Sequence, residues 1–290
     1  MLSSASASLD FMCTLTGTVA GMSNNHVSNP GRPPVSTDLA VTRVANACVL
    51  LELNGHTILT DPWFTERWYL RRGEPLGLRV IDLPALTAIV ATNFAVNHWD
   101  LRALRDYRHK ATTPVYVSAA RMARQARALG FRTVEHLGWG ETRDLAPALS
   151  IEAVPAGRTL AWRNNAYVLT SGRTRVLFGG EIQDVALLER YRAHGSPVAV
   201  ALLPVNGLRA VLGRPLVMGP REAVAGARAV GARVLVPVHD AHGADPLSLV
   251  FRRHGSGEDA RALAATDRIG LEVVCLVPGE RWEYSTAGAG

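Results

Sequence analysis

Residues 89–100 read IVATNFAVNHWD and carry the most informative pattern in the chain. The apolar run Ile-Val-Ala predicts a buried strand, which stops in a polar turn that holds Asn93, Asn97, His98 and Asp100. Proteins built on strands commonly place a binding or catalytic site where a strand ends in such a cluster. We therefore expect the functional groups to be organised around this turn.

Short predicted strands and helices alternate on both sides of this turn. Apolar runs rich in Val and Leu predict the strands, and Asn54-Gly55 predicts a hairpin turn between two of them. Apolar residues at helical spacing, closed by Gly130 and Gly231, predict two of the helices. The predicted strands are residues 40–44, 47–53, 56–60, 89–91, 114–118, 133–137, 149–154, 174–178, 198–203 and 234–238, and the predicted helices are residues 100–107, 119–129 and 220–230. This alternation is typical of the α/β class and of one half of an αββα sandwich.

The composition allows a large core and restricts the range of partners. Apolar residues make up 48% of the 290 residues and charged residues 19%, which excludes global disorder. The net charge of +6 is carried almost wholly by arginine, with Lys110 as the only lysine. A coding bias explains this excess, and affinity for an anionic substrate is the functional alternative. Because the sequence has no basic stripe with interleaved aromatic residues, we do not expect nucleic-acid binding.

The cysteines indicate the cellular compartment, and the composition of the first residues indicates the domain organisation. Cys13, Cys48 and Cys275 are few and widely spaced, which predicts a reducing, cytoplasmic compartment without disulfides or a cysteine zinc site. The sequence has no apolar run long enough to span a membrane. Residues 1–38 are rich in small and polar residues without a period and predict a flexible tail; their start is a poor secretory signal. Residues 39–286 are predicted to form a single domain.

Several motifs resemble the metallo-β-lactamase superfamily. That family carries Thr-His-x-His-x-Asp-His at the end of a strand, where this chain reads TNFAVNH over residues 92–98. The hairpin that ends in Asp-Pro-Trp-Phe at residues 61–64, and Pro-Val-Asn-Gly at residues 204–207, are similar to the branch of ascorbate-6-phosphate lactonases. The resemblance runs from about residue 40 to residue 282. It implies a four-layer αββα sandwich that acts on a small-molecule substrate.

The resemblance also assigns metal-ligand positions, and those of the first metal ion have changed. The family's three histidine positions for this ion fall on Asn93, Ala95 and Gly157. Since alanine and glycine have no ligating side chain, we do not expect this ion to bind. In the family, the position of Asp61 supports a metal-binding histidine through its second ring nitrogen.

The positions assigned to the second metal ion are better preserved. They fall on Asn97, His98, Glu181 and His239, and two histidines with one carboxylate suit Zn²⁺, Fe²⁺ or Mn²⁺. In one interpretation, a single divalent ion binds His98, Glu181 and His239, with Asn97 as a weak fourth ligand. In the other, the pocket is metal-free and these four residues are catalytic. The loss of three of the family's seven positions favours the metal-free interpretation.

Three functions remain open at this level. Histidines and a partly buried glutamate suit proton transfer, which predicts lyase, isomerase or cyclase chemistry on a small metabolite of specialised metabolism. The alternatives are a lactonase- or esterase-type hydrolase with one metal ion, and a ligand-binding pseudoenzyme without catalysis. The predicted substrate-binding residues are polar or aromatic residues near the expected site: Asn93, Arg158, Arg163, Trp63, Trp99 and Asn206. A homo-oligomer is also open, because lactonase-like relatives often form one.

Overall fold

The computed structural model describes residues 37–159, 162–211, 213, 215–266 and 270–286. Apart from Thr37 and Asp38, the predicted tail of residues 1–38 lies outside the described residues.

The first large sheet begins with antiparallel hairpins and continues with parallel strands. Its strand order is β16-β1-β2-β3-β4-β5-β6, antiparallel as far as β3 and parallel from β3 to β6. Asn54 (φ 47°) and Gly55 (φ 84°) form the predicted turn between β2 and β3 with two positive φ angles, as a type I′ hairpin requires. The strands are β16 (Arg281–Tyr284), β1 (Leu39–Ala45), β2 (Cys48–Leu53), β3 (His56–Thr60), β4 (Ala88–Ala91), β5 (Val115–Val117) and β6 (Val134–His136).

The second large sheet repeats this plan in the other half of the chain. Its strand order is β15-β13-β11-β10-β9-β8-β7, parallel from β15 to β10 and antiparallel from β10 to β7. A small sheet pairs β12 (Arg209–Ala210) with β14 (Phe251–Arg252). The strands of the large sheet are β15 (Glu272–Val273), β13 (Val234–Val238), β11 (Val200–Pro204), β10 (Thr174–Phe178), β9 (Trp162–Ser171), β8 (Leu149–Thr159) and β7 (Thr142–Ala146).

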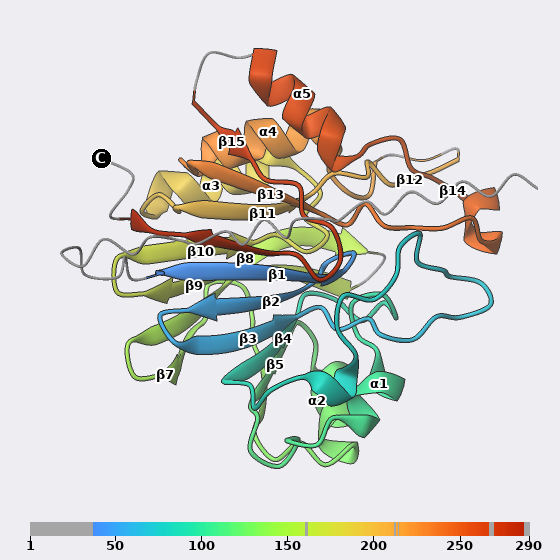
Figure 1. Cartoon of the computed structure of the whole chain (residues 1–290), viewed down its shortest axis with the longest axis vertical. Helices are drawn as coiled ribbons and strands as arrows, with labels where there is room; N and C mark the ends of the chain where they lie inside the picture. Colours follow the sequence, from blue (N-terminus) through green and yellow to red (C-terminus); the bar gives the residue numbers. More distant parts are fainter. Residues whose placement is uncertain (1–36, 160–161, 212, 214, 267–269, 287–290) are drawn as a thin grey trace, which may run out of the picture. The chain divides into compact units, whose positions relative to one another are not determined.

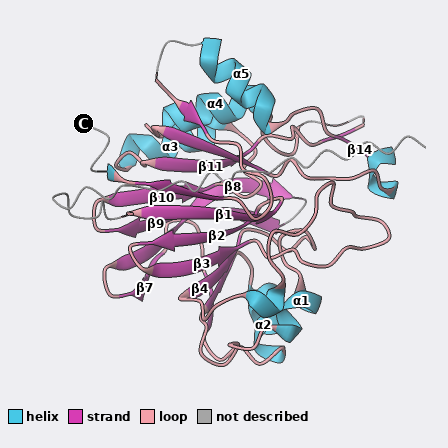
Figure 2. Ribbon diagram, in the orientation of Figure 1, coloured by secondary structure: helices cyan, strands magenta, loops and turns pink. Residues whose placement is uncertain are grey.

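Helices cover the outer faces of the two sheets, as Figures 1 and 2 show. Apolar side chains from both sheets form the central core, including Leu51, Tyr167 and Phe178. A second apolar cluster joins the first sheet to α1 and α2, and a third joins the second sheet to α3, α4 and α5. The helices are α1 (Leu101–Asp106), α2 (Ala120–Ala128), α3 (Val185–His194), α4 (Pro220–Ala229) and α5 (Gly257–Thr266), with 3₁₀ turns η1 (Val80–Asp82) and η2 (Pro246–Leu249). The predicted four-layer αββα sandwich is therefore confirmed.

Two helices were not expected from the sequence. The α3 and α5 segments contain several alanines and charged residues, and in each the few large apolar side chains give little helical periodicity. They are helical because they lie on the second sheet and on α4, where Leu188, Ala260 and Ala264 are buried. Tertiary packing, not local pattern, therefore determines these two elements.

Gly77 lies where the segment after β3 crosses the first sheet. Its N–H donates to the carbonyl of Val44 (2.9 Å), and a Cβ atom at this position would lie 2.2 Å from the backbone nitrogen of Gly279 and 2.5 Å from the carbonyl oxygen of Arg43. The backbone of β1 and the chain before β16 therefore leave no room for a side chain.

We expect Gly77→Ala to lower the free energy of unfolding by about 1–3 kcal/mol, because the added methyl group overpacks this crossing. Urea denaturation measures the change. Gly138→Ala is the matched control: its Cβ would meet only the flexible side chain of Glu141, so the stability should change by less than about 0.5 kcal/mol. An unchanged stability of Gly77→Ala would contradict the close approach.

Candidate functional site

Five polar residues follow the carboxyl ends of parallel strands and meet between the two sheets. Asp61 follows β3, Asn93 lies two residues after β4, Glu181 follows β10, Asn206 follows β11 and His239 follows β13. Open sheets of parallel strands place binding sites at these ends, because the loops that leave neighbouring strands converge there. Each sheet therefore supplies part of one buried polar cluster.

His98 is the centre of this cluster. Its Nδ1 lies 2.7 Å from Oδ2 of Asp61, and both side chains are fully buried. Asp61 also accepts hydrogen bonds from the backbone N–H and the hydroxyl of Thr92, each at 2.7 Å. The carboxylate therefore fixes the ring orientation of His98 and directs Nε2 toward the interior of the cluster.

Three potential ligand atoms converge on that side. Nε2 of His98 lies 3.0 Å from Nε2 of His239, and Oε1 of Glu181 lies 3.1 Å from each of them. The sequence predicted that these three residues would act together, and the structure brings them together. Asn97, the fourth predicted catalytic residue, has its amide nitrogen 3.3 Å from Nε2 of His239.

The charges in the cluster are strongly coupled. Burial alone would lower the pKa of His98, but the carboxylates of Glu181 and Asp61 outweigh it and raise that pKa to about 10. Burial would raise the pKa of Glu181, yet His98 and the hydrogen bonds from both histidines hold it well below its usual range. Burial lowers the pKa of His239. At neutral pH the cluster therefore contains an imidazolium, a carboxylate and a neutral imidazole.

Two asparagines complete the hydrogen bonds of the cluster. The amide nitrogen of Asn93 donates to Oε2 of Glu181 (3.0 Å), and that of Asn206 donates to Nδ1 of His239 (2.8 Å). Both were predicted to bind substrate, but they are 2% and 1% exposed and contact catalytic candidates directly. Their position fits a role in orienting Glu181 and His239.

The backbone is strained where the cluster meets the strands. His239 has a φ of 63° and Asp61 a φ of 37°, values that are uncommon for residues with a side chain. Such strain persists where surrounding contacts impose it, and it concentrates at functional sites.

Gln183 is a residue near the site that the sequence analysis missed. A Cβ atom on Gly157 would lie 2.2 Å from Oε1 of Gln183, so the glutamine fills the space in front of this glycine. It also bonds the backbone of Arg158 in both directions, accepting from its N–H (3.2 Å) and donating to its carbonyl (2.8 Å). Its position two residues after Glu181 was the available signal.

The two predicted arginines lie on the hairpin of β8 and β9. Both Arg158 and Arg163 are exposed, and their guanidinium groups lie 5.7 and 4.9 Å from the ring centre of Trp139. Closer to the cluster, Phe94 pairs with Trp162 at 5.4 Å between ring centres, and Trp162 is 38% exposed. The hairpin therefore carries aromatic and cationic groups beside the turn that follows β4.

Trp63 and Trp99, which the sequence predicted to bind substrate, are both buried in the structure. Trp99 is buried in the apolar cluster beneath α1 and α2, and its indole N–H donates to Gln125 (3.3 Å). Trp63 is fully buried and packs its ring 5.6 Å from that of His242. Both indoles therefore pack inside the protein, because burying their large apolar surface is more favourable than exposing it to solvent.

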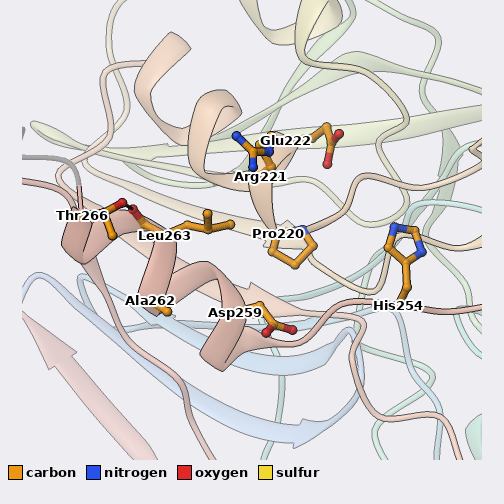
Figure 3. A pocket seen from close by; sticks show the side chains of 8 residues that line it. All are labelled: Pro220, Arg221, Glu222, His254, Asp259, Ala262, Leu263 and Thr266. Atoms are coloured by element: carbon orange, nitrogen blue, oxygen red, sulfur yellow. Dashed lines mark hydrogen bonds between the residues drawn. The ribbon is translucent and has the colours of Figure 1, made fainter.

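One cavity beside the helices of the second sheet is separate from this cluster. A cavity of about 590 Å³ opens between the start of α4 and α5, and Figure 3 shows its lining residues, which include Glu222, His254 and Asp259. None of its lining residues belongs to the buried cluster. A neighbouring cavity of about 440 Å³ is bounded by Gln183 and Gly207, each within two residues of a member of the cluster.

Comparison with known proteins gives a consistent picture. A family model described as a beta-lactamase superfamily domain matches residues 56–239. An uncharacterized protein of Mycobacterium tuberculosis is 28% identical over 265 residues, which covers 84% of this chain and 68% of that protein. An uncharacterized protein of Mycobacterium bovis matches to the same extent.

Solved structures with low sequence identity share the fold. An isothiocyanate hydrolase from Delia radicum gut bacteria has a TM-score of 0.70 at 19% identity, covering 85% of this chain and 99% of that one. The metallo hydrolase Igni18 from Ignicoccus hospitalis has a TM-score of 0.65 at 17% identity, covering 85% and 98%. CmlA, a diiron beta-hydroxylase from Streptomyces venezuelae, has a TM-score of 0.64 at 17% identity, covering 87% and 55%.

Within the part of the chain that the structure describes, none of the helices has the length and apolar character needed to cross a membrane.

The cluster fits a metal ion in its distances but not in its hydrogen bonds. Ligand atoms about 2.1 Å from one ion lie about 3.0–3.4 Å apart, close to the spacing of the three atoms here. A metal-bound Nε2 of His239 needs its proton on Nδ1, but Nδ1 faces the amide nitrogen of Asn206, which is a donor. The contact with Asn206 therefore favours a proton on Nε2 of His239, the atom that would have to offer a lone pair to a metal ion.

Because the pKa of His98 is raised on folding, the free energy of unfolding should decrease at alkaline pH. A group whose pKa rises on folding, here from 6.5 to about 10, stabilises the fold below the lower value, and this contribution is lost as the pH rises through the higher value. We expect the free energy of unfolding to fall between about pH 7 and pH 10, with a slope approaching about 1.4 kcal/mol per pH unit. Urea denaturation at several pH values measures it.

Asp61→Asn should flatten this slope, because it removes one of the carboxylates that raise the pKa of His98. Glu283→Gln, on the exposed edge strand β16, should leave the slope unchanged. Equal slopes in all three proteins would show that His98 is not the titrating group.

Proposed function

The chain belongs to the beta-lactamase superfamily, and on that premise we propose that it is an enzyme that performs acid–base chemistry on a small metabolite without a dinuclear metal site. The reaction class is elimination, isomerisation or cyclisation. The observation that carries the proposal is an unbroken series of buried polar contacts between side chains, each within 3.1 Å. The series runs through Asp61, His98, Glu181, His239 and Asn206.

Glu181 is the proposed base. In the resting site its Oε1 lies 3.1 Å from the Nε2 atoms of both His98 and His239, which lowers its pKa. A substrate oxygen that takes over these N–H groups removes stabilisation from the carboxylate, so its basicity rises as the substrate binds. Substrate binding and activation of the base are thereby coupled.

His98 and His239 are the proposed stabilisers of negative charge. The pKa of His98, raised to about 10, keeps it cationic at neutral pH, and Asp61 holds its ring in place. When Glu181 removes a proton next to a carbonyl group, charge develops on the oxygen, where a fixed imidazolium in a buried site has its largest effect. His98 can then donate its own Nε2 proton to the substrate oxygen, and the proton taken up by Glu181 can pass to Nε2 of His98 and reset the site.

The surroundings support a small, partly apolar substrate with an anionic group. Phe94 and Trp162 offer aromatic surface, and Arg158 and Arg163 offer positive charge on the neighbouring hairpin. We propose a role in specialised metabolism and a cytoplasmic location, in which the free cysteines Cys48 and Cys275 stay reduced.

A second candidate function is hydrolysis with one metal ion on His98, Glu181 and His239. The spacing of their three ligand atoms favours it. This function would require His239 to move its proton from Nε2 to Nδ1.

The test uses protein purified without a metal-binding tag and treated with a chelator. A panel of small carbonyl compounds, including lactones and hydroxy acids, is incubated in D₂O, and NMR records proton exchange, rearrangement and elimination. We expect turnover by chelated protein with less than about 0.1 equivalent of bound metal. We also expect a loss of about 100-fold or more in Glu181→Gln and His98→Gln.

The matched control is Glu135→Gln, because Glu135 is a partly exposed glutamate of β6 that pairs with Arg143, and this variant should keep full activity. About one equivalent of metal, with turnover abolished by chelation, would favour the hydrolase. Ligand binding without turnover of any compound in the panel would favour the pseudoenzyme.

A further inference from the structure

We propose that Asn206 holds His239 in the tautomer with its proton on Nε2, so that His239 donates a hydrogen bond to a substrate oxygen and is not available as a metal ligand. The acceptor is a carbonyl, enolate or carboxylate oxygen; this part rests on the proposed function. The tautomer itself is a property of the resting protein.

The amide of Asn206 has a fixed orientation. Its Oδ1 accepts the backbone N–H of Leu208 (3.0 Å), which leaves Nδ2 as the group that faces His239. The backbone of Asn206 is held as well, because its carbonyl accepts the N–H of His254 (2.9 Å). Turning the amide over would place Nδ2 against the N–H of Leu208, and two donors would then face each other in a site that is 1% exposed.

This orientation determines where the proton of His239 lies. Amide Nδ2 donates and does not accept, so Nδ1 of His239, at 2.8 Å, has to be the acceptor. A neutral imidazole has one N–H, which is then on Nε2 and lies 3.1 Å from Oε1 of Glu181. His98 differs because its Nδ1 also carries a proton, which it donates to the carboxylate of Asp61.

Asn97 is a competing neighbour, but it does not determine the tautomer. Its Nδ2 lies 3.3 Å from Nε2 of His239, a longer contact than the 2.8 Å from Asn206 to Nδ1. Among the described hydrogen bonds, no second bond fixes the amide of Asn97, so it can turn its oxygen toward the Nε2 proton. The amide of Asn206 has a partner on its oxygen and on its nitrogen, and it therefore determines the tautomer of His239.

The consequence concerns the chemistry that His239 can perform. The ring of His239 keeps the position that directs Nε2 to Glu181 and His98, but it presents a proton where a metal ion requires a lone pair. The Nε2 atoms of His98 and His239 are 3.0 Å apart, so their N–H groups avoid facing each other only by pointing to one shared acceptor. In the resting site this acceptor is Oε1 of Glu181, and a substrate oxygen can take its place. The amide of Asn206 thus favours binding of an oxygen acceptor at Nε2 of His239 and disfavours binding of a metal ion there.

The first experiment reads the tautomer directly. Protein labelled with ¹⁵N-histidine is prepared metal-free, and long-range ¹H–¹⁵N spectra of the imidazoles show which ring nitrogen carries the proton. We expect His239 to be protonated on Nε2, with His98 as the internal reference that carries a proton on Nδ1. Assignment uses His239→Gln and His98→Gln. A His239 protonated on Nδ1 in the parent would overturn the proposal.

The second experiment changes the partner of His239. Asn206→Asp keeps an acceptor for Leu208 and offers the second carboxylate oxygen to Nδ1, so the proton should move to Nδ1. Zn²⁺ affinity, measured by titration against a competing chelator, should then rise by about 10-fold or more. Asn164→Asp is the matched control: it is also a buried asparagine, but it donates to Thr159 and should leave the tautomer and the affinity as they are.

The two proposals fail separately. If Asn206→Asp leaves the proton on Nε2 and Zn²⁺ binding unchanged, the role of Asn206 is excluded, whatever the protein catalyses. If the tautomer and the affinity change as expected but the parent turns over no compound in the panel, the role of Asn206 stands and the proposed function does not.

Discussion

The ion pair between His98 and the carboxylates of Asp61 and Glu181 is the interaction on which the rest of the site depends. It is buried, and burial opposes an imidazolium unless opposite charges surround it. Asp61 lies on one side at 2.7 Å and Glu181 on the other at 3.1 Å, so the charge is paired from both directions. The loops of both sheets have to meet at this point, because Asp61 follows β3 and Glu181 follows β10.

The loops meet because the two large sheets have the same arrangement of strands. Each large sheet has antiparallel hairpins on one side and parallel strands on the other, and the parallel strands release their polar residues at their carboxyl ends. Apolar side chains packed between the sheets then fix the positions of the two sets of loops relative to each other. The two halves also touch closely at Gly180: a Cβ atom there would lie 2.4 Å from Oγ1 of Thr92, and the backbone has a φ of 56°, so this position requires a glycine.

Solved structures that share this fold include a metallo hydrolase and a diiron hydroxylase. In this chain, two asparagine amides contact members of the polar cluster. Asn93 and Asn206 have amide groups, which donate as well as accept, in contact with Glu181 and His239. An amide that donates to a carboxylate or to a ring nitrogen uses the lone pair that would otherwise be available for binding or catalysis. The polar cluster is therefore satisfied within the protein, and a substrate has to compete with these internal hydrogen bonds.

The sequence by itself determined the α/β class, most of the strands and the three residues at the centre of the site. Apolar runs followed by turn residues are local signals. The resemblance assigned His98 through the frame at residues 92–98, and Glu181 and His239 through the ends of two later strands. Only the tertiary structure decided which groups these residues contact. Asn206 and His239 are 33 residues apart, and the parallel pairing of β11 with β13 brings them together. Gln183 fills the space before Gly157, and Trp99 is buried, for the same reason: hydrogen bonding and burial depend on neighbours that are distant in the chain.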